Sequence, residues 1–223
     1  MNAASRSDSE ARAAVVAAAQ ALFANGVMSH AGHANLSARA GTDSMLLTVS
    51  GVVRDLTPDR LARVGLDGAV LEGRLDTVNA EIVTMHSRVY QARPQVGGII
   101  HTHSPHLLAF AMANRPLPCR YEALLRFGQA EDVPVVPWAP RGSERSVGGI
   151  IDAITAHPGT QAVLLGNHGV LVFGPGPAEA AALLTAMEEA AEGELAAAVL
   201  GGAASFPPGA LEDVRASMAR ARP

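Results

Sequence analysis

The chain contains no lysine, so all 17 of its lysine-plus-arginine residues are arginines. Without a lysine amine, no Schiff base can form with a carbonyl substrate, and that route of covalent catalysis is excluded. The single cysteine, Cys119, excludes an intrachain disulfide and fits a reducing compartment, so we expect a cytoplasmic protein. Its neighbours Pro118 and Arg120 supply no base that would activate the thiol, which favours a packing role for Cys119.

Long apolar runs and clusters of basic residues are also missing. No apolar run reaches membrane-spanning length, and residues 1–6 lack the charged-then-apolar order of a signal peptide, so we expect no membrane partner. A net charge of −4 without an arginine cluster gives no support to nucleic-acid binding. The 48% hydrophobic and 17% charged residues are typical of a globular chain. Its length favours a single domain over residues 1–223, with a core over about 10–200 and a C-terminal tail over 201–223.

The expected secondary structure mixes strands with helices. Strands are predicted over 36–39, 45–49, 96–100, 163–165 and 170–173, with a hairpin over 65–73 and a short edge strand over 133–136. Helices are predicted from a cap at Ser7 or Asp8 to about 25, from Asn79 to Pro94, and over 105–114, 143–156 and 177–200, with a last one after Pro207. Short hairpin-like connections favour antiparallel pairing. The sequence therefore predicts an α/β fold, a three-layer α/β/α sandwich with a central, mostly antiparallel sheet.

Three histidines stand next to apolar, β-prone runs. His101 and His103 follow the run 96–100, and His168 follows the run 161–165. Because side chains alternate along a strand, His101 and His103 point to the same face. With a third imidazole from another strand end, they would form a divalent-metal site that leaves one position open for water or substrate. His-x-His also arises by chance, and a single histidine is more commonly a surface or core residue, so spacing alone leaves both interpretations open.

Five short segments occur in a fixed order and spacing along most of the chain: Asn35–Arg39, Val49–Gly51, Asn79–Glu81, His101–His103 and Asn167–Gly169. In this order they resemble the class II aldolase and adducin family, over roughly residues 10–200. The resemblance implies the family's fold and a divalent-metal-dependent carbon–carbon lyase, with His101, His103 and His168 as the metal ligands. Zinc is the expected ion, with manganese or cobalt as alternatives, because imidazole ligands discriminate poorly among them.

The resemblance also implies catalytic roles for Glu81 and Tyr121. Glu81 matches the carboxylate that exchanges protons with the substrate, a role that requires a water-poor pocket. Tyr121, in the segment Pro118–Tyr121, matches a catalytic tyrosine. Without the resemblance, Glu81 would be interpreted as an acid that the helix dipole favours near a helix start. The resemblance further implies a homo-oligomer, a tetramer, with active sites between subunits.

The expected substrate-binding segments depart from those of sugar-phosphate members of the family. Those members bind phosphate with Gly-Asn, Ser/Thr-Gly and Ser-Ser pairs, where this chain has Ala34–Asn35, Ser50–Gly51 and Asn79–Ala80. Two hydroxyls are missing and Ala34 adds a methyl group, so the chain offers fewer groups for a phosphate cradle. Asn35, Ser50, Gly51 and Asn79 remain candidate substrate-binding residues.

Three further polar residues in this region, His30, His33 and Arg54, are suited to bind a carboxylate or a phenolic oxygen. An equally good interpretation is ordinary loop polarity for the histidines and a solvated arginine. Together these features favour a small, non-phosphorylated hydroxy-carbonyl or hydroxy-carboxylate substrate.

The expected reaction is aldol cleavage or decarboxylation, for example of a hydroxylated aromatic carboxylate, through a metal-stabilised enediolate or carbanion. One alternative is a sugar-phosphate aldolase, an epimerase or a dehydratase on the same metal platform. An alternative of another class is a non-catalytic, adducin-like interaction domain. The complete set of His101, His103, His168 and Glu81 argues against that last alternative.

Overall fold

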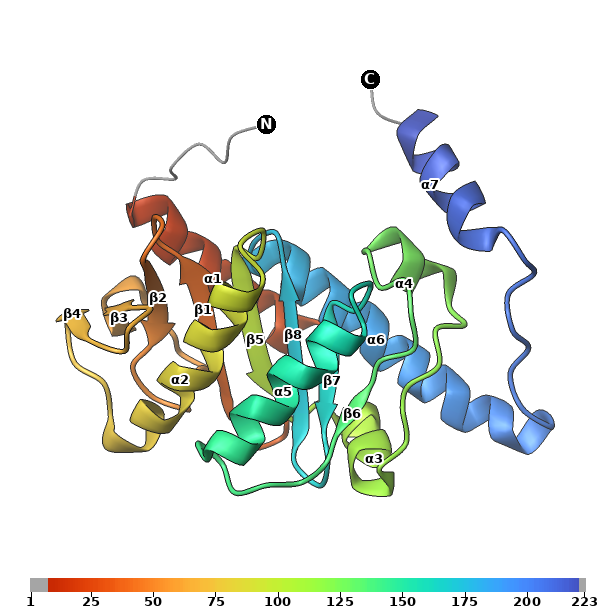
Figure 1. Cartoon of the computed structure of the whole chain (residues 1–223), viewed down its shortest axis with the longest axis horizontal. Helices are drawn as coiled ribbons and strands as arrows, with labels where there is room; N and C mark the ends of the chain where they lie inside the picture. Colours follow the sequence, from red (N-terminus) through yellow and green to blue (C-terminus); the bar gives the residue numbers. More distant parts are fainter. Residues whose placement is uncertain (1–7, 221–223) are drawn as a thin grey trace.

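One sheet of eight strands, in the order β4-β3-β2-β1-β5-β8-β7-β6, organises the fold in the computed structural model (Figure 1). The model describes residues 8–220, apart from the side chains of Val78 and Ala80. The strands are β1 (Ala34–Arg39), β2 (Ser44–Thr48), β3 (Leu61–Gly65), β4 (Val70–Glu72), β5 (Gly98–Thr102), β6 (Val135–Val136), β7 (Ala162–Leu165) and β8 (Gly169–Gly174). Neighbouring strands are antiparallel, except for the parallel pair β6 and β7. The prediction of a mostly antiparallel sheet is confirmed.

Helices cover both faces of the sheet. α1 (Asp8–Ala24), α3 (Pro105–Ala113) and α6 (Pro177–Ala197) pack against one face, and α2 (Thr77–Ala92) and α5 (Glu144–Ala156) pack against the other. In Figure 1, α2 and α5 cross in front of the strands while α1 and α6 lie behind them. Successive β5 residues alternate between the layers, because Ile99 packs with the α2 and α5 side and Ile100 with the α1 and α6 side. This arrangement confirms the predicted α/β/α sandwich.

Several boundaries differ from the predictions. α2 begins at Thr77, two residues before Asn79, because the N–H of the extended residue Asp76 donates to the Val49 carbonyl and fixes the helix start. The edge strand β6 is shorter than predicted, because Val133 exchanges backbone hydrogen bonds with Leu117 instead. α6 ends at Ala197, and a 3-10 turn continues to Leu200.

Other segments were either missed or match the predictions. The short helix α4 (Glu122–Arg126) and a 3-10 turn over Pro58–Arg60 were not predicted, and α7 (Ala210–Arg220) follows Pro207 as expected. Residues 1–6 and Ser7, which carried the leader and cap predictions, lie outside the described residues. Within residues 8–220, no helix combines the length and the hydropathy needed to cross a membrane. Burial raises the pKa of the Cys119 thiol to about 11, which agrees with a packing role.

Candidate metal centre and active site

His101 lies inside β5, on the sheet face that α2 and α5 cover. Its backbone neighbours are Asn35 on β1 and Leu171 on β8, and only 4% of the residue is exposed. The ring Nδ1 is 2.9 Å from the Val170 carbonyl oxygen. Because a carbonyl can only accept, Nδ1 must carry the proton, which leaves the Nε2 lone pair for a metal ion.

The other two histidines reach the same place from neighbouring segments. His103 follows the end of β5, and His168 lies in the turn between β7 and β8. Asn167 adopts a left-handed conformation, with a φ of 55°, and so turns the chain just before His168. A Cβ atom on Gly169 would stand 2.5 Å from the Thr102 oxygen and 2.6 Å from His103 Cδ2. The Asn-His-Gly segment therefore makes a tight turn and leaves room for the ring of His103.

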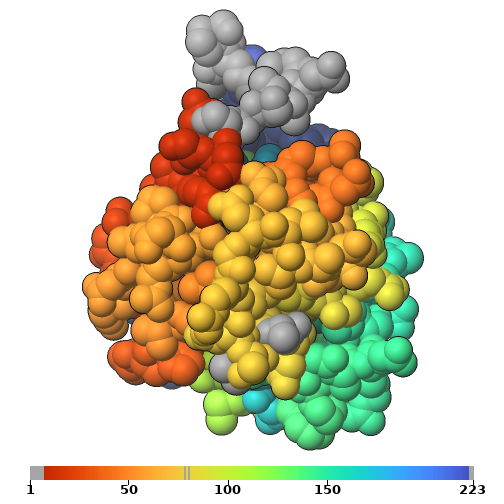
Figure 2. All heavy atoms as spheres, turned by 90° about the vertical axis from the view of Figure 1, so that its left-hand side faces the viewer, coloured from red at the N-terminus to blue at the C-terminus, as the bar shows by residue number. Residues whose placement is uncertain are grey.

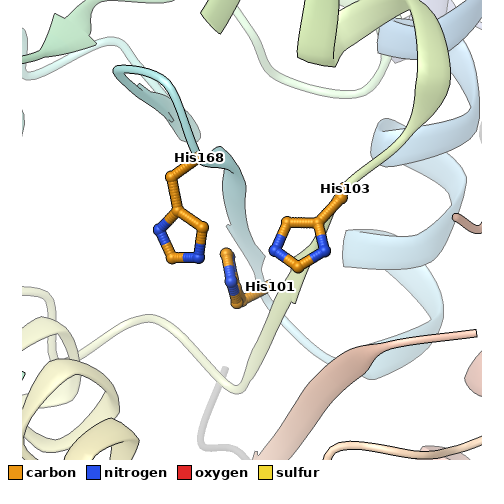
Figure 3. A group of neighbouring side chains, drawn as sticks. All are labelled: His101, His103 and His168. Atoms are coloured by element: carbon orange, nitrogen blue, oxygen red, sulfur yellow. The ribbon is translucent and has the colours of Figure 1, made fainter. Parts of the chain in front are cut away.

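The three imidazoles converge on a shared space. Their ring centroids are 4.7 to 5.2 Å apart, and one ligand nitrogen from each lies within 4.8 Å of the others. Figure 3 shows the three rings turned toward one another from β5, the end of β5 and the β7–β8 turn. Nε2 of His103 is buried and has no hydrogen-bond partner. A buried, unpaired nitrogen between two other imidazoles fits a cation as its missing partner.

The electrostatics of the cluster keep the rings in the neutral form that binds metals. Burial lowers the pKa of His101 well below its usual value, and the charges of His168 and His103 lower it further. Burial, then His103 and Arg141, lower the pKa of His168 to about 4. Burial, then the charges of His33 and Arg141, also lower the pKa of His103. The donor set of three neutral imidazoles fits a divalent metal ion.

Glu81, on α2, forms an ion pair with Arg141. Its Oε2 is 2.9 Å from Nε of Arg141, in the segment between β6 and α5. The two side chains are 50% and 45% exposed, so within one chain Glu81 does not lie in the expected water-poor pocket. Figure 2 shows the yellow atoms of α2 against the turquoise atoms of the α5 region on this side of the molecule. The charge of Arg141 lowers the pKa of both His103 and His168, so Arg141 lies within electrostatic range of the cluster.

A buried hydrogen-bond chain supports the same face of the sheet. His86 on α2 places Nε2 2.7 Å from Oδ1 of Asn35 and Nδ1 2.7 Å from Oγ of Ser37. The Ser37 hydroxyl is in turn 2.9 Å from the Tyr90 hydroxyl. Burial lowers the pKa of His86 to about 3, so the ring is neutral and carries one proton. The network assigns that proton to Nε2, since Asn35 Oδ1 can only accept.

Sequence reasoning missed both His86 and Arg141. His86 and Tyr90 stand four residues apart on α2, a spacing that places two side chains on one helix face, and this signal was present in the sequence. For Arg141 the sequence holds no comparable signal, because only the packing of the segment before α5 against α2 brings it to Glu81.

Three predicted substrate-binding residues lie together at the end of β2, with partners inside the protein. The Asn79 amide donates to the Thr48 carbonyl at 2.9 Å, and the Ser50 hydroxyl donates to the Val52 carbonyl at 3.3 Å. A Cβ atom on Gly51 would stand 3.9 Å from Oδ1 of Asn79. The amide of Asn79 therefore ties α2 to β2. The side chain of Ala80 lies outside the described residues.

The remaining predicted residues differ in their distance from the cluster. His33 is exposed and close enough for its charge to act on His103. The Arg54 guanidinium stacks over Phe23, 4.5 Å from the ring centroid. Tyr121 donates to Glu189 on α6 at 3.2 Å, and α4, which follows Tyr121, lies at the opposite end of the sheet from the β7–β8 turn (Figure 1). One chain therefore does not bring Tyr121 to the three histidines.

Comparison with known proteins agrees with this geometry. Residues 13–195 match the family model described as "Class II Aldolase and Adducin N-terminal domain". A 5-methylthioribulose-1-phosphate/5-deoxyribulose-1-phosphate aldolase of Rhodospirillum rubrum is 30% identical over 159 residues, which are 71% of this chain and 68% of the relative. A 3-oxo-tetronate 4-phosphate decarboxylase of Escherichia coli is 30% identical over 165 residues, which are 71% of this chain and 74% of that protein.

A solved structure shows the same fold. The structure of an L-fuculose 1-phosphate aldolase superposes with a TM-score of 0.82 at 23% identity, covering 95% of this chain and 97% of the other. The family model, the two curated relatives and the histidine cluster agree on one kind of enzyme, a metal-dependent lyase, which includes both aldolases and decarboxylases. The chain belongs to the class II aldolase and adducin family, as a metal-dependent lyase.

Proposed function

We propose that the protein cleaves a carbon–carbon bond in a small, non-phosphorylated hydroxy-carbonyl or hydroxy-carboxylate compound, with Glu81 as its acid–base group. The observation that carries this proposal is the buried, unpaired Nε2 of His103 between His101 and His168. A divalent ion held there, zinc or alternatively manganese or cobalt, would polarise a substrate oxygen and stabilise the charge left by the broken bond. Glu81 pairs with Arg141, whose charge acts on His103 and His168, and in this proposal Glu81 gives or takes the accompanying proton.

The state of the expected phosphate cradle supports a non-phosphorylated substrate. The Asn79 amide and the Ser50 hydroxyl donate to backbone carbonyls, so both of these donors have partners inside the protein. A phosphate group needs several donors that converge on it. With Ala34 and Ala80 in place of a glycine and a serine, few donors remain for an anion of that size.

A second candidate is a sugar-phosphate aldolase or decarboxylase. The names of the two curated relatives favour it, because both describe phosphorylated substrates. The reaction also stays open between two types, since one relative is an aldolase and the other a decarboxylase. Both reactions leave negative charge beside a polarised oxygen, so one site serves either of them.

Calorimetric titration of zinc-loaded protein separates the two candidates. Glycolate and phosphoglycolate share a two-carbon acid and differ by the phosphate group. We expect glycolate to bind at least as tightly as phosphoglycolate, and the substitution Ser50→Ala to leave both affinities unchanged. Phosphoglycolate that binds much more tightly, and loses that advantage in Ser50→Ala, would contradict the proposal and support the sugar-phosphate candidate.

We also propose that the protein is a homo-tetramer with active sites between subunits. Tyr121 lies away from the histidine cluster within one chain, so its predicted catalytic role requires a neighbouring subunit. Inactive Glu81→Gln and Tyr121→Phe subunits, unfolded together and refolded as a mixture, should then regain part of the wild-type activity. Mixed oligomers that form without any gain in activity would contradict the shared site.

A further inference from the structure

We propose that Arg141 binds the carboxylate of the substrate at the metal centre and, in doing so, releases Glu81 for proton transfer. This inference rests on the proposed function, because it adds a specificity-determining residue to that site. The proposed substrate class is an acid whose carboxylate lies near the oxygen that the metal polarises.

The position of Arg141 is the first observation that supports its role in binding a substrate carboxylate. Its Nε is 2.9 Å from Oε2 of Glu81, and the segment that leads to it contacts the β7–β8 turn, where the Gly166 N–H donates to the Val136 carbonyl at 2.8 Å. Arg141 therefore pairs with the acid–base candidate from a segment that also borders the turn carrying His168. Arg54, which the sequence also suggests as a carboxylate-binding residue, instead stacks on Phe23.

The segment that carries Arg141 is held against Glu81 by close packing. Gly142 adopts a left-handed conformation, with a φ of 75°, and a Cβ atom there would stand 2.9 Å from Cβ of Glu81. Only glycine adopts this conformation readily and tolerates this approach. The glycine thus brings the backbone beside Arg141 against α2, so the guanidinium is placed before any ligand arrives.

The chemistry of the pair suits an exchange of carboxylates. An arginine side chain can bind a carboxylate through two parallel hydrogen bonds that it donates. Arg141 already donates to one carboxylate, that of Glu81. The exposed fractions of 45% and 50% leave the pair accessible, and exposed ion pairs cost little to separate. A substrate carboxylate that replaces Glu81 would leave the Glu81 carboxylate without this cation and able to move a proton.

The exchange makes opposite predictions for the two members of the pair. Salicylate and salicylamide serve as probes, because they share a phenolic oxygen and a ring and differ in the charge of one group. In zinc-loaded Arg141→Gln, we expect salicylate to bind about 10- to 100-fold more weakly, while salicylamide changes by less than about twofold. In Glu81→Gln, salicylate should bind several-fold more tightly, because it no longer competes with a resident carboxylate.

Arg145→Gln is the matched control, since Arg145 lies near Arg141 in the chain and donates to the Trp138 carbonyl. Its salicylate affinity should equal that of the wild type. The proposal is overturned if Arg141→Gln keeps the wild-type preference for salicylate, if the wild type shows no such preference, or if Glu81→Gln does not gain affinity. Zinc content, measured in the same samples, tests the proposed function separately. If the proposed function is wrong, the wild-type protein will hold no zinc. If only this inference is wrong, the protein will hold zinc, but the substitutions will leave its preference for salicylate over salicylamide unchanged.

Discussion

The two faces of the sheet are built from different kinds of buried side chain. The face under α1, α3 and α6 is packed mainly by aliphatic residues such as Leu36, Ile100 and Leu184, and its buried carboxylate, Glu188, accepts hydrogen bonds from the first backbone N–H groups of α3. The face under α2 and α5 has aliphatic residues too, but between them lie the histidine cluster and the hydrogen-bond chain from Asn35 to Tyr90. Both faces are formed by the same strands, so alternate residues of β1 and β5 point either into the aliphatic core or toward the polar groups.

This difference separates stability from chemistry. Buried polar groups cost free energy unless each has a partner, so a protein keeps them only where something offsets that cost. On the α2 and α5 face, His86 and Ser37 are paired with each other, whereas His103 has a buried nitrogen without a partner in the chain, which a metal ion would satisfy. We therefore regard the α1, α3 and α6 face as a scaffold and the opposite face as the site that it supports.

The largest effect is expected at Glu81 on the polar face. Glu81→Gln keeps the shape of the side chain and removes its proton transfer, so turnover should fall about 10²- to 10⁴-fold. Release of carbon dioxide or aldehyde from a panel of hydroxy-carboxylates measures turnover, with the metal content and the melting temperature as controls. Turnover within about twofold of the wild type would contradict the acid–base role and leave Glu81 as the structural partner of Arg141.

A smaller effect, on stability alone, is expected on the apolar face. Leu184→Ala in α6 removes a fully buried side chain and should lower the free energy of unfolding by about 2–5 kcal/mol. Urea unfolding of the zinc-loaded protein measures the loss. The metal content per folded chain should stay at the wild-type value, and loss of metal from folded Leu184→Ala would break the proposed separation of the two faces.

The smallest effect is expected at the far end of the hydrogen-bond chain. Tyr90→Phe removes one hydroxyl and keeps the buried ring, so the free energy of unfolding should fall by about 0.5–1.5 kcal/mol. The same urea experiment measures it, and zinc content should not change. A loss as large as that of Leu184→Ala would mean that the hydrogen-bond chain stabilises the fold as much as the aliphatic packing of the opposite face.

Much of the fold was predictable because local signals and tertiary structure agree. The turn at Gly26, the proline starts at Pro105 and Pro177, and the apolar runs around His101 and His168 each mark an element that the structure contains. α4 was missed because its five residues are too few for a helical period to show. The strand predicted from Val133 was too long, because pairing with Leu117 depends on a distant segment.

The candidate site was predictable only in part, because some of its residues are marked by local patterns and others are brought together only by tertiary packing. His101 and His103 share a strand face, so their convergence follows from the strand period, and His168 was found through its motif. Arg141 has no motif, and its place beside Glu81 depends on how the segment before α5 packs on α2. The roles of Glu81 and Tyr121 and the single-domain organisation of residues 1–223 stay predictions.

Metal analysis of the purified protein tests the central claim most directly. Zinc is measured per folded chain in the wild type, in His103→Ala, and in His157→Gln as a control, since His157 pairs with Glu131 outside the cluster. The account predicts about one ion per chain in the wild type and in His157→Gln, and almost none in His103→Ala. Equal metal content in the wild type and His103→Ala would contradict it.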